Sequence, residues 1–166
     1  MWTGLLRLTM GLTMAMVMQT AQAADLVLES YFSGKTRATG AFGAINGVKR
    51  TFTVDLTGRF DGRTLVLRED FVFADGERDT KTWRFTKTAP GRYSGTREDV
   101  IGTTHVAISG RVARFNYLVN LGTAAKPNIV RFHDRMVLKD DGRLINTAWV
   151  TKFLFPVART KVIFQR

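Results

Sequence analysis

Residues Arg50–Gly76, RTFTVDLTGRFDGRTLVLREDFVFADG, decide the fold because they contain two strand-like runs separated by a turn. In the first run apolar and polar side chains alternate, so that Phe52, Val54 and Leu56 fall on one face. In the second run leucines and phenylalanines share a face in the same way. Alternation with a period of two is typical of half-buried β-strands. Asp61-Gly62 between the runs predicts a hairpin with a type I′ turn, because that turn needs positive φ angles.

The rest of the chain repeats this pattern of short alternating segments and tight turns. Asn46-Gly47, Pro90-Gly91 and Asp141-Gly142 are further turn signals. One helical turn is expected within residues 25–34, where apolar residues have i, i+3, i+4 spacing. About ten short segments at this spacing indicate an antiparallel barrel or sandwich. Consecutive hairpins favour an all-β, antiparallel up-and-down barrel of roughly 8–10 strands, because closure removes exposed sheet edges.

The N-terminal residues 1–23 have the pattern of a secretory signal. A short basic segment precedes the apolar run Leu8–Met18, and Ala21-Gln22-Ala23 is a small-x-small cleavage site. The alternative is a membrane anchor, but the apolar run is shorter than the roughly 20 residues needed to span a bilayer. We therefore expect cleavage after residue 23, a single β-barrel domain at residues 24–166, and a periplasmic or secreted protein.

Composition limits the chemistry. The chain has no cysteine, which excludes disulfides, thiolate metal sites, a cysteine nucleophile and a lipid-anchored cysteine. The formal net charge is +11, yet the basic residues are spread over strands and turns rather than gathered in one run. This distribution and the secretory signal argue against a nucleic-acid partner. Solvated strand faces are the first interpretation of the charge, and weak attraction to an anionic membrane surface or polysaccharide is the second.

Several segments resemble a known family. These are LESYFSG, ATGAFG, GRYSGTREDVIG and LINTAWVTKFLF, together with the central hairpin, and REDFVFADG and DDGRLIN are the most specific stretches. The chain resembles a family of small bacterial envelope proteins that is described as a domain of unknown function, many of whose members are assigned as lipoproteins. The resemblance implies a lipocalin-like barrel in the cell envelope and no known activity. This chain lacks the acceptor cysteine of the lipoproteins.

Polar residues in register with apolar ones are the candidates for a site. A buried charge without a partner costs several kcal/mol, so such groups should pair with each other or meet a ligand. We expect an interior polar cluster of Glu69, Arg97, Asp99, Asp134, Asn146 and Lys152, with an apolar lining of Phe52, Phe71, Trp83, Tyr93 and Phe132. The alternative is a structural ion-pair network, or register shifts that place some of these residues outside.

No motif for a phosphate loop, a nucleophile elbow or a metal site is present, so no metal or cofactor is predicted. His105 and His133 are expected on the surface. The predicted function is non-catalytic binding or carriage of a small apolar or amphipathic, lipid-like ligand inside the barrel. An isomerase- or cyclase-type enzyme that uses an interior carboxylate is one alternative, and a structural envelope protein with a filled barrel is another. A cavity of roughly 300 Å³ or more would favour the first two functions over the third.

Overall fold

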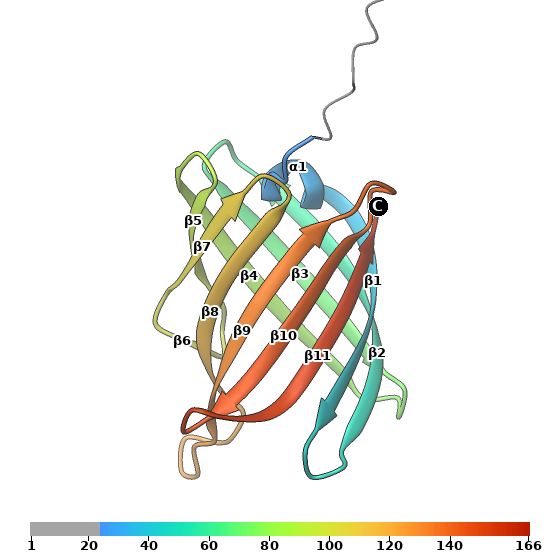
Figure 1. Ribbon diagram of the computed structural model, residues 1–166, viewed down its shortest axis with the longest axis vertical. Coiled ribbons are helices and arrows are strands. Elements are labelled where there is room, and N and C mark those ends of the chain that lie inside the picture. Colours follow the sequence, from blue (N-terminus) through green and yellow to red (C-terminus); the bar gives the residue numbers. More distant parts are fainter. Residues whose placement is uncertain (1–23) are drawn as a thin grey trace, which may run out of the picture.

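The computed structural model describes residues 24–166, which form one short helix and an eleven-stranded sheet (Figure 1). The predicted signal segment, residues 1–23, lies outside the described residues. Within the described range, no helix has the length and apolar character that crossing a membrane requires. The elements are α1 (Leu28–Phe32), β1 (Gly34–Ala44), β2 (Lys49–Phe60), β3 (Thr64–Phe73), β4 (Arg78–Ala89), β5 (Arg92–Thr96), β6 (Val100–Ile101), β7 (Thr104–Ser109), β8 (Val112–Asn120), β9 (Ile129–Leu138), β10 (Leu144–Lys152) and β11 (Phe155–Gln165).

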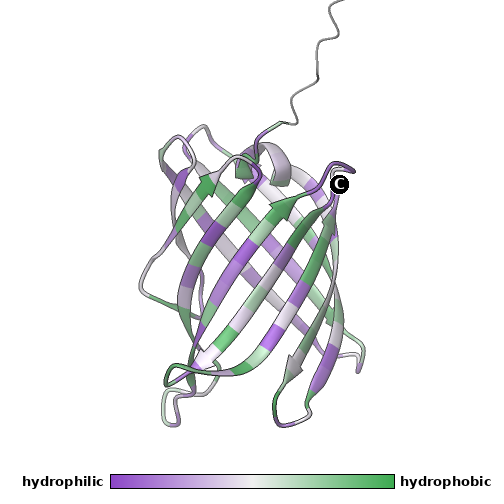
Figure 2. Ribbon diagram, in the orientation of Figure 1, coloured by the Kyte–Doolittle hydropathy of each residue, from purple (hydrophilic) through white to green (hydrophobic). Residues whose placement is uncertain are grey.

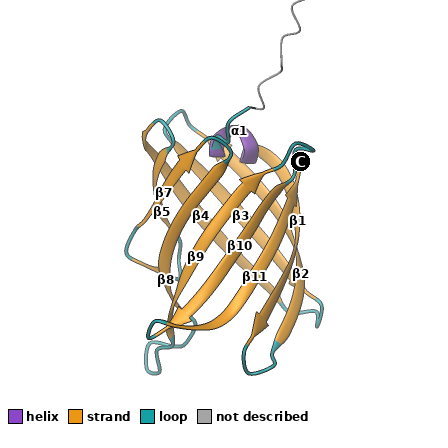
Figure 3. Ribbon diagram, in the orientation of Figure 1, coloured by secondary structure: helices purple, strands orange, loops and turns teal. Residues whose placement is uncertain are grey.

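The sheet closes on itself. Strands that follow one another in sequence pair as antiparallel neighbours, and β1 pairs with β11 to close the ring. Strand β5 pairs directly with β7, while the two-residue β6 pairs only with the far end of β8. The ring therefore has ten strands, and the predicted all-β up-and-down barrel is confirmed (Figure 3).

The β2–β3 hairpin forms as predicted, with the predicted apolar faces but a different turn. Leu56 faces Glu69 and Gly58 faces Leu67 across the ladder, so both apolar faces point into the barrel. Only Gly62 in the turn has a positive φ, at 96°, so the turn is not the expected type I′, which needs two such residues. The Asp61 carboxylate instead closes the turn by accepting hydrogen bonds from the backbone amides of Arg63 and Thr64, at 2.8 and 2.7 Å.

The barrel interior is built from alternating residues of every strand in the ring. Figure 2 shows hydrophilic and hydrophobic positions alternating along the strands. Aromatic rings meet inside: Tyr117 lies 5.1 Å from Trp83 in an edge-to-face contact and stacks on Phe132 at 5.4 Å. Such pairs stabilise the fold beyond the area that they bury. The outer face is mostly polar, so the barrel has one core.

Helix α1 covers one end of the barrel and is held on two sides. The Tyr31 hydroxyl accepts a hydrogen bond from the Leu144 amide at 3.1 Å and lies at the same distance from the carbonyl oxygens of Gly142 and Phe164. On the other side the Glu29 carboxylate accepts hydrogen bonds from Tyr93 and Lys87, both at 2.6 Å. The helix thus links β4 and β5 to β10 and β11.

Hydrogen bonds at Glu29 also set its protonation. Burial would raise the pKa of the carboxyl group, but the hydrogen bonds from Lys87 and Tyr93 outweigh that effect and hold the pKa below its usual value. The carboxylate is therefore charged at neutral pH, where it fastens α1 most strongly.

Gly58 makes the close approach of α1 to β2 possible. A Cβ atom at this position would lie 1.9 Å from the Phe32 carbonyl oxygen, which is backbone and cannot swing aside. We predict that Gly58→Ala lowers the free energy of unfolding by roughly 3 kcal/mol or more, as overpacking does. Gly43→Ala is the matched control, because nothing lies within 4 Å of a Cβ there. Urea denaturation measures both, and equal stability of the two variants would contradict this account.

Candidate functional site

The barrel encloses a cavity of about 170 Å³. Its walls are mainly aromatic and aliphatic, with a small group of polar side chains. This volume does not reach the roughly 300 Å³ that was expected to favour a binding or catalytic function over a filled barrel, but it is close to the roughly 150 Å³ of a cavity that holds one benzene ring. The lining side chains of the central strands include Phe52, Phe71, Trp83, Phe115, Phe132 and Met136.

Four polar side chains from four parts of the ring face this cavity. Glu69 comes from β3, Arg97 from the residue after β5, Asp134 from β9 and Asn146 from β10. Each occupies an inward position of the alternating pattern, which is why the chain brings them together across the barrel. The Asn146 amide donates a hydrogen bond to Asp134 Oδ1 at 2.5 Å.

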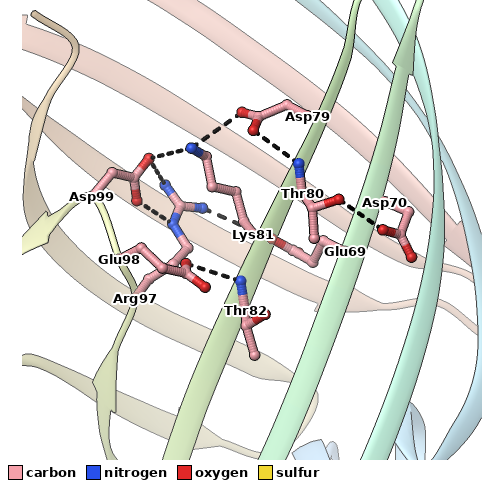
Figure 4. Close-up of polar contacts among 9 residues, drawn as sticks. All are labelled: Glu69, Asp70, Asp79, Thr80, Lys81, Thr82, Arg97, Glu98 and Asp99. Carbon is pink, nitrogen blue, oxygen red and sulfur yellow. Dashed lines mark hydrogen bonds and ion pairs between the residues drawn. The ribbon is translucent and has the colours of Figure 1, made fainter.

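Arg97 is the only cation among the cavity-lining residues of the described chain. Its Nε donates a hydrogen bond to Asp99 Oδ1 at 2.7 Å, and its Nη1 lies 3.8 Å from Glu69 Oε2 (Figure 4). The guanidinium also lies over the Trp83 ring, 4.8 Å from its centroid. Stacking on a ring while binding carboxylates is a geometry that arginine adopts and lysine does not reproduce.

Lys81 extends this network toward the barrel edge. Its ammonium lies 3.1 Å from an Asp79 oxygen and 3.6 Å from an Asp99 oxygen, and Asp99 in turn binds Arg97 (Figure 4). Sequence reasoning did not include Lys81 in the cluster. Its alternation with Trp83 on β4 was the available signal, because both fall on the same face of the strand.

Burial changes the protonation of the two interior carboxyl groups. Desolvation raises the pKa of Glu69 to about 7, although the Arg97 charge opposes the shift, and it raises the pKa of Asp134 to about 6 against the hydrogen bond from Asn146. Desolvation also raises the pKa of the buried Tyr117 hydroxyl well above its usual value. Near neutral pH the cavity therefore offers a carboxyl group that can accept or donate a proton.

Two buried acceptor atoms in this cluster have no hydrogen-bond partner among the described residues. They are Asp134 Oδ2 and Asn146 Oδ1, which belong to the two side chains that bind each other through their remaining atoms. Buried polar atoms are rarely left without a partner, and each such atom costs roughly 1–3 kcal/mol. Both atoms can therefore accept further hydrogen bonds, and the Tyr117 hydroxyl lies close enough to Asp134 to lower its pKa through a hydrogen bond.

The structure brings together most of the predicted polar cluster but not all of it. Glu69, Arg97, Asp134 and Asn146 line the cavity, and Asp99 supports Arg97 from the edge. The predicted convergence is wrong for Lys152, whose ammonium binds the Asn128 side chain at 2.7 Å. Lys152 is the last residue of β10, six positions beyond the cavity-lining Asn146, and it lies beside the β8–β9 loop that contains Asn128. Its distance along the strand therefore separates it from the cluster.

Most of the predicted apolar lining is in place. Phe52, Phe71, Trp83 and Phe132 line the cavity. Tyr93 is buried but lies outside the lining, since its hydroxyl binds Glu29 beneath α1. Sequence reasoning missed Phe115 and Tyr117, although their alternation along β8 is the same signal that identified the other strands.

The histidines lie away from the cavity, as predicted. His105 and His133 are both exposed on outer strand faces. Across residues 24–166 no group of three or more His, Asp or Glu side chains is placed to hold a metal ion.

The raised pKa of Glu69 gives a prediction for stability against pH. A folded-state pKa near 7 means that the folded protein keeps a proton that the unfolded chain releases above about pH 4.5. The contribution of Glu69 to stability is therefore present below pH 4.5 and is lost as the pH rises to about 7. The free energy of unfolding of Glu69→Gln should rise by roughly 1–3 kcal/mol relative to that of the wild type over this pH interval. Urea unfolding at each pH measures this difference.

The matched control for that measurement is the neighbouring Asp70. Its hydrogen bonds with Arg68 and Thr80 hold its pKa below the usual value, and it lies on the outer face. The free energy of unfolding of Asp70→Asn should therefore shift in the opposite direction. It should fall relative to that of the wild type as the pH rises through the acid range. A pH-independent difference between wild type and Glu69→Gln would show that Glu69 is not desolvated.

Comparison with known proteins supports the fold and gives the family. No curated protein sequence matches this chain. Among solved structures, the barrel is similar to the S-type phycobiliprotein lyase CPES from Guillardia theta, with a TM-score of 0.53 and 7% identity over 81% of this chain and 86% of that chain. This likeness shows the fold alone, which is lipocalin-like. Residues 7–166 match the family model "Protein of unknown function (DUF3833)", so the chain belongs to that family, as the sequence resemblance predicted.

Proposed function

We propose that this protein binds or carries a small amphipathic molecule inside its barrel, without catalysis, in the cell envelope. The observation that supports this most directly is a pair of buried acceptors, Asp134 Oδ2 and Asn146 Oδ1, which have no hydrogen-bond partner among residues 24–166 and lie within a mainly apolar cavity. An apolar cavity with a few convergent polar groups is the usual form of a small-molecule site. The signal-like segment at residues 1–23 is the basis for the envelope location.

The chemistry of the polar cluster limits the ligand. Unpartnered oxygen acceptors call for a ligand group that donates hydrogen bonds, such as a hydroxyl, amine or amide. The surrounding rings of Phe52, Phe71 and Phe132 would contact an apolar part of the ligand. A volume near 170 Å³ accommodates a single ring or a short chain with its polar group. A longer molecule would place only one end in this cavity.

The structural neighbour gives general support. It is a phycobiliprotein lyase, and its fold is similar to this barrel over most of both chains. The nature of any ligand here rests on the residues of this chain.

Native mass spectrometry of protein purified from the cell envelope tests the proposal. We expect the wild type to retain a small molecule that is released on denaturation. Val162→Phe, which fills part of the cavity from β11, should reduce the bound fraction at least about fivefold. Ile163→Phe is the matched control, since successive strand residues face opposite sides and residue 163 lies on the outer wall. Equal retention by both variants, or a wild type without any bound molecule, would contradict the proposal.

An enzyme is the second candidate, supported by Glu69. A buried carboxyl group with a pKa of about 7 that lines a cavity is suited to general acid–base catalysis of the isomerase or cyclase type. Once native mass spectrometry identifies the molecule, Glu69→Gln separates the two functions. A carrier should keep most of its binding, whereas an acid–base enzyme should bind the molecule and lose its turnover by about 100-fold or more.

A further inference from the structure

Large apolar side chains are exposed at the end of the barrel opposite α1. They come from the β1–β2 turn, at the lower right of Figure 1, and from the β8–β9 loop and the β10–β11 turn, at the lower left. In Figure 2 the β10–β11 turn, at the lower left, is coloured as hydrophobic. The exposed residues of this apolar end are Ile45, Val48, Leu121, Ile129, Phe153, Leu154 and Phe155, of which Leu154 is 93% and Phe153 85% exposed.

Contacts between the segments make the apolar end one surface. The Ile45 amide donates a hydrogen bond to the Val157 carbonyl oxygen at 2.9 Å, which joins the β1–β2 turn to β11. The Lys152 ammonium bonds to Asn128 at 2.7 Å, which joins the end of β10 to the β8–β9 loop. Clustered exposed apolar side chains mark interaction surfaces, whereas single ones are ordinary.

The β10–β11 turn exposes its apolar side chains and has an unfavourable backbone conformation. Phe153 and Leu154 have φ angles of 48° and 71°, in the left-handed region that residues other than Gly, Asn and Asp rarely adopt. Two-residue hairpin turns with this geometry ordinarily contain Asn and Gly. Packing within the chain does not explain the choice of Phe and Leu, because both side chains are exposed.

Charge identifies the kind of partner. The three segments 45–50, 120–131 and 151–159 contain no acidic residue. Their basic residues are Lys49, Arg50, Lys126, Arg131, Lys152 and Arg159. Arg50 is neutralised by Asp75 and Glu77 of the adjacent β3–β4 turn, and the other five have no acidic partner within 4 Å in the described chain. Apolar side chains surrounded by unpaired basic ones complement the surface of an anionic bilayer.

The outer wall beside the apolar end also exposes an aromatic side chain next to a basic one. Trp149 on β10 is 55% exposed, and the Arg159 guanidinium lies over its ring at 5.3 Å from the centroid. Tryptophan with a neighbouring arginine is typical of residues at the interface between water and lipid headgroups. A second copy of this chain is a poorer partner for this surface, because the net charge of +11 makes two copies repel each other.

We propose that the apolar end docks the barrel on the surface of an anionic lipid bilayer, with Phe153 and Leu154 inserted among the acyl chains near the headgroups. Lys49, Lys126 and Lys152 would contact the acidic headgroups. This inference rests on the outer surface and does not depend on the proposed ligand in the cavity.

Co-sedimentation of the purified protein with vesicles tests the proposal. The vesicles contain phosphatidylcholine alone or with about 30% phosphatidylglycerol. We expect binding to the anionic vesicles only, weakened by salt. Phe153→Asn combined with Leu154→Gly should reduce the partition coefficient about tenfold or more, because the inserted side chains are removed. The same variant should unfold at a temperature equal to or above that of the wild type, since Asn and Gly suit the turn. Lost binding then cannot be explained by misfolding.

A pair of charge variants tests the position of the contact. Lys49→Gln with Lys126→Gln should reduce binding to the anionic vesicles about thirtyfold at low salt. Lys35→Gln with Lys139→Gln removes the same charge near the α1 end, where both side chains are exposed, and should reduce binding less than about threefold. Equal effects of the two pairs, or unchanged binding by the turn variant, would overturn the proposal. A wild-type dimer that the turn variant dissociates would also overturn it, by assigning the surface to a second copy.

Discussion

Closure of the ring is the constraint on which the other features depend. Pairing of β1 with β11 and of β8 with β9 leaves the ten-strand ring without a free edge, so each strand has one face inside and one outside. Inward side chains from opposite walls then share one interior. Glu69 on β3 and Asp134 on β9 are far apart in the sequence and on opposite sides of the ring, yet both line the same cavity. An open sheet would leave these carboxyl groups in water.

Two opposing effects set the chemistry of that interior. Desolvation favours the neutral form of both carboxyl groups, and the Arg97 guanidinium favours the charged form. At Glu69 the effect of desolvation exceeds that of the Arg97 charge. The Arg97 guanidinium lies 3.8 Å from Glu69 and is shared with Asp99, which it binds at 2.7 Å. The same network contains acceptor atoms that no residue of the described range 24–166 satisfies. A purely structural network would be expected to satisfy its own polar atoms, and this difference favours a ligand site.

The two ends of the barrel have different physical characters. At one end α1 is fixed by Tyr31 and Glu29, and the exposed surface there carries charges of both signs. At the other end, three loops expose apolar side chains with basic residues among them, beside the acidic β3–β4 turn that neutralises Arg50. Folding alone does not account for this difference between the ends, since the strained Phe153–Leu154 turn buries neither of its side chains. The asymmetry would give a membrane-bound barrel a defined orientation.

The sequence by itself determined the barrel, because alternation and turn residues are local properties of the chain. The period of two in Arg50–Gly76 was enough to place Glu69 inside, and the same argument placed Asp134 and Asn146. Only the tertiary structure decided which inward residues meet. Lys152, at the end of β10, bonds to Asn128 of the β8–β9 loop, and the Tyr93 hydroxyl donates a hydrogen bond to Glu29 of α1. Bulges, closure and the cavity depend on contacts between distant strands, and no local pattern encodes those distances.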